Sequence, residues 1–445
     1  MRPIGIDLFA GAGGMSLGFE QAGFDVVAAV EIDPVHCAVH KFNFPNCAVM
    51  PRSVVGLSGA EIRLAAGIGN RSVDVVFGGA PCQGFSMIGQ RAFDDPRNAL
   101  VRDFLRIVAE LDASYFVFEN VKGLTLGQHK RFLDEIVSVA NTLGYAVRLP
   151  WKVLDAANFG TPQHRERLIL FGAKKRLALP DYPAAITRAA DGRGKAPTDL
   201  PCGPTALHAL DDLPNAEAYD ELRTTDEVKA TRWANPSPYA AALRCMTNDA
   251  WHLGYVRNWD PLLLTSSART EHTAISRRRF ATTPGGETEP VSRFYKLAPG
   301  GLSNTLRAGT DGARGAFTSP RPIHYRENRC ITVREMARLH GYPDWFRFNE
   351  TKWHGARQIG NSVPPPLAKA IAGMVIGALG VRLDRPFEAL ELGDPALLRM
   401  NLSQASAYFG VQALPSRRDR KSGAVKRKQE DIELDRQSRQ VAAYA

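Results

Sequence analysis

The sequence predicts an α/β fold with a doubly wound, mostly parallel sheet, together with a smaller, irregular domain that contains short strands. Three continuous apolar runs support the sheet, because strands buried on both faces are apolar throughout. They are Val73–Phe77, Tyr115–Val121 and Leu168–Phe171. A fourth run, Ile4–Phe9, leads through a glycine-rich turn into a helical stretch, which is typical of a βαβ unit.

The glycine-rich turn Ala10–Gly14 predicts a nucleoside site. A helix is expected from Met15 to Ala22, and the following strand ends at Glu31, where nucleotide-binding βαβ units place an acid for ribose hydroxyls. A dinucleotide dehydrogenase is disfavoured because Ser16 stands where the third glycine belongs. S-adenosylmethionine needs only ribose, adenine and carboxylate contacts and fits better, with a ligand-free turn as the alternative.

The loop that follows the Val73–Phe77 run carries a candidate nucleophile, Cys82. Open α/β sheets place their ligands at the carboxyl ends of their strands, and Cys82 is expected there. The next strand ends in Glu119, and the third is preceded by Gln163–Arg167, so one sheet edge would gather a thiol, a carboxylate and two guanidiniums. The alternative is a cysteine that packs as a small buried hydrophobe.

Seven short segments, in this order, resemble the DNA cytosine-5 methyltransferase family of the bacterial restriction-modification type. The segments frame residues 4–172 and about 328–375. They are Asp7–Gly14, Glu31–Asp33, Pro81–Ser86, Glu119–Val121, Gln163–Arg167, Thr332–Glu335 and Gly360–Val363.

The resemblance implies a covalent mechanism on cytosine. The Cys82 thiolate adds to carbon 6, which makes carbon 5 nucleophilic, while Glu119 holds the ring N3 and the exocyclic amine. Arg167 matches the position that contacts the base carbonyl, and Arg165 is expected near the cysteine loop. Carbon 5 is inaccessible inside a duplex, so the base must be flipped out. No side chain is assigned as the base that removes the carbon-5 proton, and water can serve.

The resemblance also implies S-adenosylmethionine as the cofactor, with S-adenosylhomocysteine as the product and no metal. In place of the aspartate that usually meets the adenine amine, this chain has Ser53, so somewhat weaker cofactor binding is expected. The expected cofactor-binding residues are Asp7, Phe9, Ala10, Gly11, Gly13, Glu31, Ile32, Ser53, Val54, Pro81, Leu100, Asn361 and Ser362.

The charge of the chain favours double-stranded DNA as the partner. Its net charge is +10, and residues 269–334 hold twelve Lys and Arg against five Asp and Glu, with aromatic residues interspersed. This stretch lies where the family carries its target-recognition domain, but the recognised sequence cannot be read from it. The expected DNA contacts are Gln83, Ser86, Arg91, Arg277, Arg278, Arg279, Arg293, Thr305 and Arg307.

Four regions are expected along the chain. Residues 1–215 and 328–385 form the catalytic domain, 216–327 the target-recognition domain, and 386–445 a basic extension that is partly disordered from about residue 415. Thr332–Gly341 reads as a capped helix, and Leu367–Leu379 as an alanine-rich helix after a proline stop. Leu262–Thr265 and Ser303–Leu306 are expected to form short strands.

Six cysteines without paired C-x-x-C spacing argue against zinc and disulfides and for a reducing cytoplasm. No signal peptide is expected, and no run approaches the length of a membrane span. The chain is expected to be a monomer, either paired with a separately encoded restriction endonuclease or solitary. Two alternatives stay open. One is a tRNA cytosine-5 methyltransferase, disfavoured by the long variable region and a missing Cys-Phe-Thr signature. The other is a silent DNA-binding protein, disfavoured by the presence of Cys82, Glu119, Arg165 and Arg167.

Overall fold

The computed structural model describes residues 2–81, 99–125, 129–194, 196–310 and 318–412. Its central sheet has the strand order β3-β2-β1-β4-β5-β8-β6, and β7 pairs with β8. The first five strands of this order run parallel, whereas β8 runs antiparallel to β5, β6 and β7. The strands are β1 (Ile4–Leu8), β2 (Asp25–Glu31), β3 (Ala48–Pro51), β4 (Val75–Gly78), β5 (Tyr115–Val121), β6 (Tyr145–Val147), β7 (Lys152–Asp155) and β8 (Glu166–Lys174).

Helices cover both faces of this sheet, as the doubly wound prediction requires. Alternate residues of β4 and β5 explain why: Val75 and Val117 pack with α1 and α11, whereas Val76 and Phe116 pack with α3, α4 and α5. The helices are α1 (Gly14–Ala22), α3 (Gly59–Ala66), α4 (Ala99–Glu110), α5 (His129–Thr142) and α11 (Pro365–Leu379), with α2 (Pro34–Asn43) after β2.

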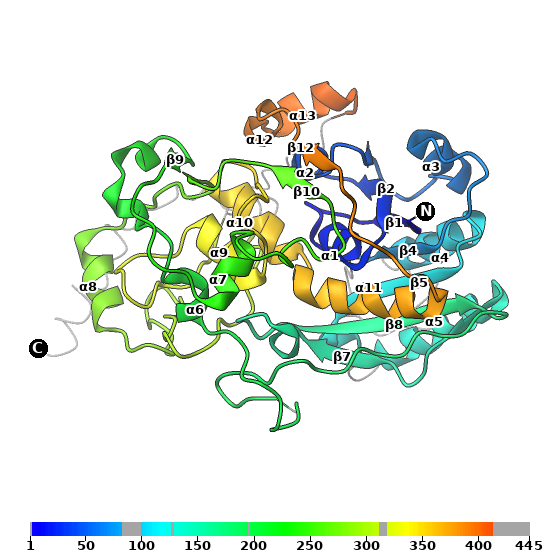
Figure 1. Cartoon of the computed structure of the whole chain (residues 1–445), viewed down its shortest axis with the longest axis horizontal. Coiled ribbons are helices and arrows are strands. Elements are labelled where there is room, and N and C mark those ends of the chain that lie inside the picture. Colours follow the sequence, from blue (N-terminus) through cyan, green and yellow to red (C-terminus); the bar gives the residue numbers. More distant parts are fainter. Residues whose placement is uncertain (1, 82–98, 126–128, 195, 311–317, 413–445) are drawn as a thin grey trace, which may run out of the picture.

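The remaining elements are short and build a second half of the molecule beside the sheet (Figure 1). Many of them share a core around α6 and α9, which also includes Ala10, Leu17, Ala29, Phe44 and Cys47 of the sheet half. They are α6 (Ala206–Leu210), β9 (Val228–Lys229), α7 (Pro238–Leu243), β10 (Val256–Asn258), β11 (Leu263–Leu264), α8 (Ala274–Thr282), α9 (Val333–His340) and α10 (Lys352–Asn361). Single 3₁₀ turns are η3 (Lys122–Thr125), η4 (Ala156–Phe159), η5 (Ala216–Ala218) and η6 (Asp220–Arg223).

The chain after α11 contacts both halves of the molecule and connects them. Strand β12 (Ala389–Glu391) pairs in parallel with β10, and helices α12 (Ala396–Arg399) and α13 (Leu402–Phe409) pack on α2. Residues 244–258, which fall inside the expected recognition domain, also contact the sheet half, because the buried Arg257 guanidinium pairs with Glu20 of α1 at 2.7 Å. The expected disordered tail from residue 415 lies outside the described residues.

Local patterns predicted several elements closely. Strand β5 has the predicted bounds, and α9 begins with the capping box of Thr332 and Glu335 and ends at Gly341 in a left-handed conformation. The prediction of a strand over Ser303–Leu306 is wrong, because only an isolated bridge joins Ser303 to Gln163. Helix α11, expected from Leu367, begins two residues earlier at Pro365, because proline is favoured at the first position of a helix.

One stretch, Lys352–Leu379, has the length and mean hydropathy of a membrane span, contrary to the expectation that no run reaches that length. It consists of two helices, because α10 ends at Asn361 and the prolines begin α11 at Pro365. The apolar side chains of α11 pack against α1 and the sheet. Its composition is therefore explained by its place in the core.

The close packing of α1 on α11 yields a stability prediction. A Cβ added at Gly18 would lie 2.4 Å from the Cβ of Ala368 and 2.6 Å from the Lys369 amide nitrogen, so the helices would have to separate. We expect Gly18→Ala to lower the free energy of unfolding by about 1–3 kcal/mol. Gly373→Ala on α11 is the matched control, because its Cβ would meet no atom within 4 Å. Urea unfolding should show the control unchanged or stabilised by up to about 1 kcal/mol, and equal losses would contradict the packing.

Candidate active site

A cavity of about 730 Å³ opens at the carboxyl ends of β1, β2, β4 and β5. Its volume lies in the range of small-molecule sites, roughly 300–1,000 Å³. Twelve of the thirteen expected cofactor residues line it: Asp7, Phe9, Ala10, Gly11, Glu31, Ile32, Ser53, Val54, Pro81, Leu100, Asn361 and Ser362. The exception is Gly13, which precedes α1 with a φ of 100° and whose Cβ would lie 2.5 Å from the Phe44 ring, so its contribution is conformational.

Glu31 holds the turn that forms one wall of this cavity. Its carboxylate accepts hydrogen bonds from the amides of Gly11 and Asp33, both at 2.9 Å. Beside it, Ile32 is half exposed and presents an apolar surface to the cavity. A carboxylate next to an apolar surface fits a nucleoside, which has polar ribose hydroxyls and a flat base. The Ser53 hydroxyl accepts from the Val55 amide at 3.1 Å, so its oxygen already has one partner.

Asp7 is a buried carboxyl group at the end of β1. It accepts a hydrogen bond from the Ser16 hydroxyl at 2.6 Å, and the same hydroxyl lies 3.0 Å from Nε2 of His40. Burial raises the pKa of Asp7 to about 8, an effect that the Ser16 hydrogen bond opposes and the charge of Glu31 reinforces. Asp7 is therefore largely protonated at neutral pH.

The raised pKa of Asp7 predicts a pH-dependent stability. Between the ordinary pKa of about 4 and a folded value near 8, the folded chain holds a proton that the unfolded chain has lost, so stability falls as pH rises through this window. Asp7→Asn removes this loss, and we expect the variant to gain stability over wild type between pH 5 and pH 8 in urea unfolding. Asp134→Asn, at an exposed position on α5, should show no such trend. A pH-independent difference for Asp7→Asn would contradict the assignment.

Glu119 lies at the inner end of the cavity on β5. Its Oε1 forms an ion pair of 2.8 Å with Nε of Arg167 on β8, and both side chains line the cavity. Burial raises the pKa of Glu119, although Arg167 and Arg165 act in the opposite direction. Gly79 leaves room for this carboxylate, since a Cβ there would lie 2.2 Å from Oε2.

Arg165 is almost completely buried and connects three parts of the chain. Its terminal nitrogens donate to the carbonyls of Leu306 at 3.0 Å and Gly360 at 2.8 Å. The expected position near the cysteine loop cannot be compared, because residues 82–98 lie outside the described structure. Burial lowers the pKa of Arg165 to about 9.

Gln163 has a role that its motif in the sequence does not predict. Its amide oxygen accepts from the Leu306 amide at 3.1 Å, and its nitrogen lies 2.9 Å from Nδ1 of His340. Gln163 and Arg165 therefore both bind Leu306, within the expected recognition domain, and hold it at the start of β8. The only signal in the sequence was their spacing, which places two side chains on one face of an extended segment.

The expected DNA contacts divide into three groups. Gln83, Ser86 and Arg91 lie outside the described residues, as does the expected nucleophile Cys82. Arg278, Arg293, Thr305 and Arg307 are exposed, and Thr305 and Arg307 line the cavity. Arg277 and Arg279 form ion pairs with Glu217 and Glu289, which counts against a phosphate contact from either. Adjacent arginines on a helix point to different sides, so the Arg277–Arg279 run does not make one basic surface.

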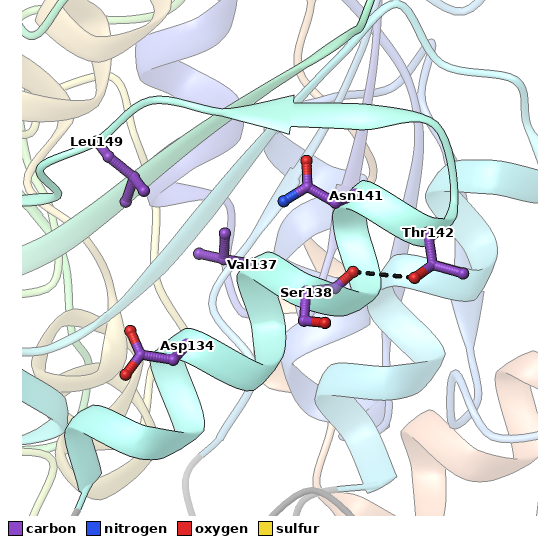
Figure 2. Close-up of a pocket in the computed structure, with 6 residues that line it drawn as sticks. All are labelled: Asp134, Val137, Ser138, Asn141, Thr142 and Leu149. Atoms are coloured by element: carbon purple, nitrogen blue, oxygen red, sulfur yellow. Dashed lines mark hydrogen bonds between the residues drawn. The ribbon is translucent and has the colours of Figure 1, made fainter.

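Elsewhere the described residues offer little chemistry. No group of three or more His, Cys, Asp or Glu side chains among them is placed to hold a metal ion. A separate hollow lies between α5 and the β6–β7 connection (Figure 2). Its lining residues are Asp134, Val137, Ser138, Asn141, Thr142 and Leu149. Asp134 is its single ionisable side chain, so it lacks the converging polar groups of the main cavity.

Comparisons with known proteins agree with this geometry. The model of the family described as C-5 cytosine-specific DNA methylase matches residues 4–377. The Type II methyltransferase M.XorII of Xanthomonas oryzae pv. oryzae is 56% identical over 412 residues, 93% of each chain. The Type II methyltransferase M1.HphI of Haemophilus parahaemolyticus is 32% identical over 378 residues, 83% of this chain and 86% of its own.

A solved structure extends the agreement to the fold. The crystal structure of a prophage-encoded DNA modification methyltransferase (E. coli) superposes with a TM-score of 0.67 at 31% identity, covering 85% of this chain and 100% of the other. The sheet order, the cavity and these likenesses identify one family. The chain belongs to the C-5 cytosine-specific DNA methylases, which are S-adenosylmethionine-dependent DNA methyltransferases.

Proposed function

We propose that this chain methylates carbon 5 of a flipped-out cytosine, within a specific double-stranded DNA sequence, through a covalent bond to Cys82. The observation that carries the proposal is the Glu119–Arg167 pair at the inner end of a nucleoside-sized cavity. A buried carboxyl beside a guanidinium offers a donor to the ring N3 and a donor to the base carbonyl. These are the two polar sites on one edge of cytosine that gain charge during the reaction.

The chemistry starts with a poor nucleophile, carbon 5 of cytosine. When bound, S-adenosylmethionine supplies an electrophilic methyl group. The Cys82 thiolate adds to carbon 6, and the electron pair displaced from the 5,6 double bond makes carbon 5 nucleophilic. Burial raises the pKa of Glu119 and so favours its protonated form, from which a proton passes to N3 and neutralises the charge that develops on the ring. Once carbon 5 has taken up the methyl group, a base, for which water can serve, removes the carbon-5 proton. The electron pair of that bond restores the 5,6 double bond and expels the Cys82 thiolate, and N3 returns its proton to Glu119.

We assign the cofactor to the wall formed by the β1–α1 turn and the end of β2. Glu31 would bind ribose hydroxyls, Ile32 would pack on the adenine, and Asn361 and Ser362 would meet the methionine end. All four residues line the same cavity, which supports this assignment. Arg165 would act as a positioning residue for the target side, because its guanidinium joins the carbonyls of Leu306 and Gly360.

The target base would be reached by flipping, at a cost of a few kcal/mol that contacts in the cavity must offset. We further propose that the enzyme acts as a monomer in the cytoplasm. A separate restriction endonuclease would share its recognition sequence, as the Type II designation of its relatives suggests.

A covalent trap tests the mechanism. In DNA carrying 5-fluorocytosine, carbon 5 has no proton to lose after methyl transfer, so elimination stops and the bond between Sγ and carbon 6 persists. We expect wild type and Cys202→Ser, which alters an exposed free cysteine, to form a denaturant-resistant protein–DNA complex that requires S-adenosylmethionine. Cys82→Ser should form none. A fully active enzyme that forms no such complex would refute the covalent route.

A further inference from the structure

His164 lies between two carboxylates that come from different segments of the chain. Its Nδ1 is 2.7 Å from Oδ2 of Asp155, at the end of β7, and its Nε2 is 3.0 Å from Oδ2 of Asp191, in the connection between β8 and α6. A neutral imidazole has one N–H, whereas the imidazolium has two. Only the charged form of His164 can donate to both carboxylates at once.

The backbone of His164 is engaged as well. Its amide donates to the Ser303 carbonyl at 3.1 Å, and its carbonyl accepts from the Thr305 hydroxyl at 2.8 Å. The flanking residues, Gln163 and Arg165, bind the amide and the carbonyl of Leu306. His164 therefore lies where the strand that leads into the active site, the Asp191 loop and the end of the expected recognition domain meet.

We propose that His164 is a positioning residue: its imidazolium holds the Asp191 loop against Asp155 of β7, and its backbone holds the Ser303–Thr305 segment beside the start of β8, which carries Arg167. Thr305 lines both the active-site cavity and a hollow of about 430 Å³ on the His164 side. A shift of the Asp191 loop would therefore also displace Thr305 at the rim of the active-site cavity, where DNA is expected to bind. The cofactor wall is made by other segments and would not be disturbed.

The groups around His164 favour its proton. Hydrogen bonding to Asp155 raises the pKa of His164, partial burial opposes this, and Asp191 adds to the increase. The other charged or titratable residues that line the hollow are Glu166, Arg193 and Tyr295, and Glu166 is already paired with Lys122 at 2.8 Å. We call the His164 imidazolium with its two carboxylate partners, Asp155 and Asp191, the clamp. Its stabilising contribution is complete below the ordinary histidine pKa of about 6.5 and is lost as pH rises through the pKa of His164 in the folded chain.

The pH dependence of DNA methylation by the full chain tests the proposal. Asp191→Asn removes one carboxylate, and Asp181→Asn removes the exposed partner of Arg148 in the same connection as a matched control. At pH 6 we expect Asp191→Asn to raise the KM for DNA about threefold to fivefold, as for a partly exposed ion pair. The ratio to wild type should approach one by pH 9, with kcat and the Kd for S-adenosylmethionine unchanged throughout. Asp181→Asn should follow wild type at every pH.

A ratio that does not change with pH, or one shared by Asp181→Asn, would overturn the positioning role. The second measurement is histidine-selective NMR of the wild-type chain, with His164 assigned from the signal lost in His164→Gln. An imidazole that titrates above the ordinary value supports the clamp, and one that titrates at or below it overturns the clamp even if Asp191→Asn fails to fold. The kinetic readout rests on the methylation activity, whereas the NMR titration does not, so the two failures are distinguishable.

Discussion

Cys82→Ser is expected to lower methyl transfer to DNA by on the order of 10⁴-fold or more, because removal of a covalent nucleophile abolishes the step that activates carbon 5. A serine hydroxyl has the shape of the thiol but ionises far less readily near neutral pH. The measurement is single-turnover transfer of labelled methyl groups from S-adenosylmethionine to duplex DNA containing the recognised sequence.

Affinity for DNA should survive this substitution, since the expected DNA contacts are other side chains. Cys202→Ser serves as the matched control and should transfer methyl groups at the wild-type rate. Turnover by Cys82→Ser within about tenfold of wild type would remove Cys82 from the mechanism, whatever its effect on DNA affinity.

Glu119→Gln is expected to slow methyl transfer about 10²- to 10³-fold, the usual loss when one stabilising group of a developing charge is removed. The amide keeps the shape of the side chain but cannot give N3 a proton and cannot pair with Arg167 as an anion. The effect should appear in kcat at saturating DNA, while the Kd for S-adenosylmethionine stays within about twofold, because Glu31 and Ile32 lie at the end of β2, which β1 and β4 separate from β5.

Glu166→Gln is the matched control for Glu119→Gln. Glu166 lies at the start of the neighbouring strand β8, but it is exposed, pairs with Lys122 and does not line the active-site cavity. Wild-type transfer by this control and a large loss in Glu119→Gln would place the effect at the cavity. Comparable losses in both variants would indicate a general disturbance of the sheet edge.

The sequence predicted features that depend on neighbours along the chain. The bounds of β5 follow from its continuous apolar run, and α9 follows from Thr332, Glu335 and Gly341 at their helical spacings. The shared sheet edge also followed, because strand ends in an α/β sheet meet there. Twelve expected cofactor residues therefore line one cavity.

What the sequence did not predict are the contacts between distant side chains. Gln163 forms a hydrogen bond with Leu306, 143 residues away in the sequence. Arg277, which was expected to contact DNA, instead binds Glu217, 60 residues away. A run of arginines in the sequence does not indicate which side chains form ion pairs within the protein and which are free to bind phosphate. His164 was quoted only as part of a motif, because its two carboxylate partners become visible only when three separate segments are packed together.

Bisulfite sequencing of plasmid DNA tests the central claim most directly. The full chain and its Cys82→Ser variant would be expressed in a bacterial host that lacks cytosine methylation. We expect cytosines to be protected from conversion within one short sequence motif, and the protection to be lost in the variant. Complete conversion in cells that hold soluble wild-type protein able to bind S-adenosylmethionine would contradict carbon-5 methylation of DNA, and tRNA would then be the next substrate to test.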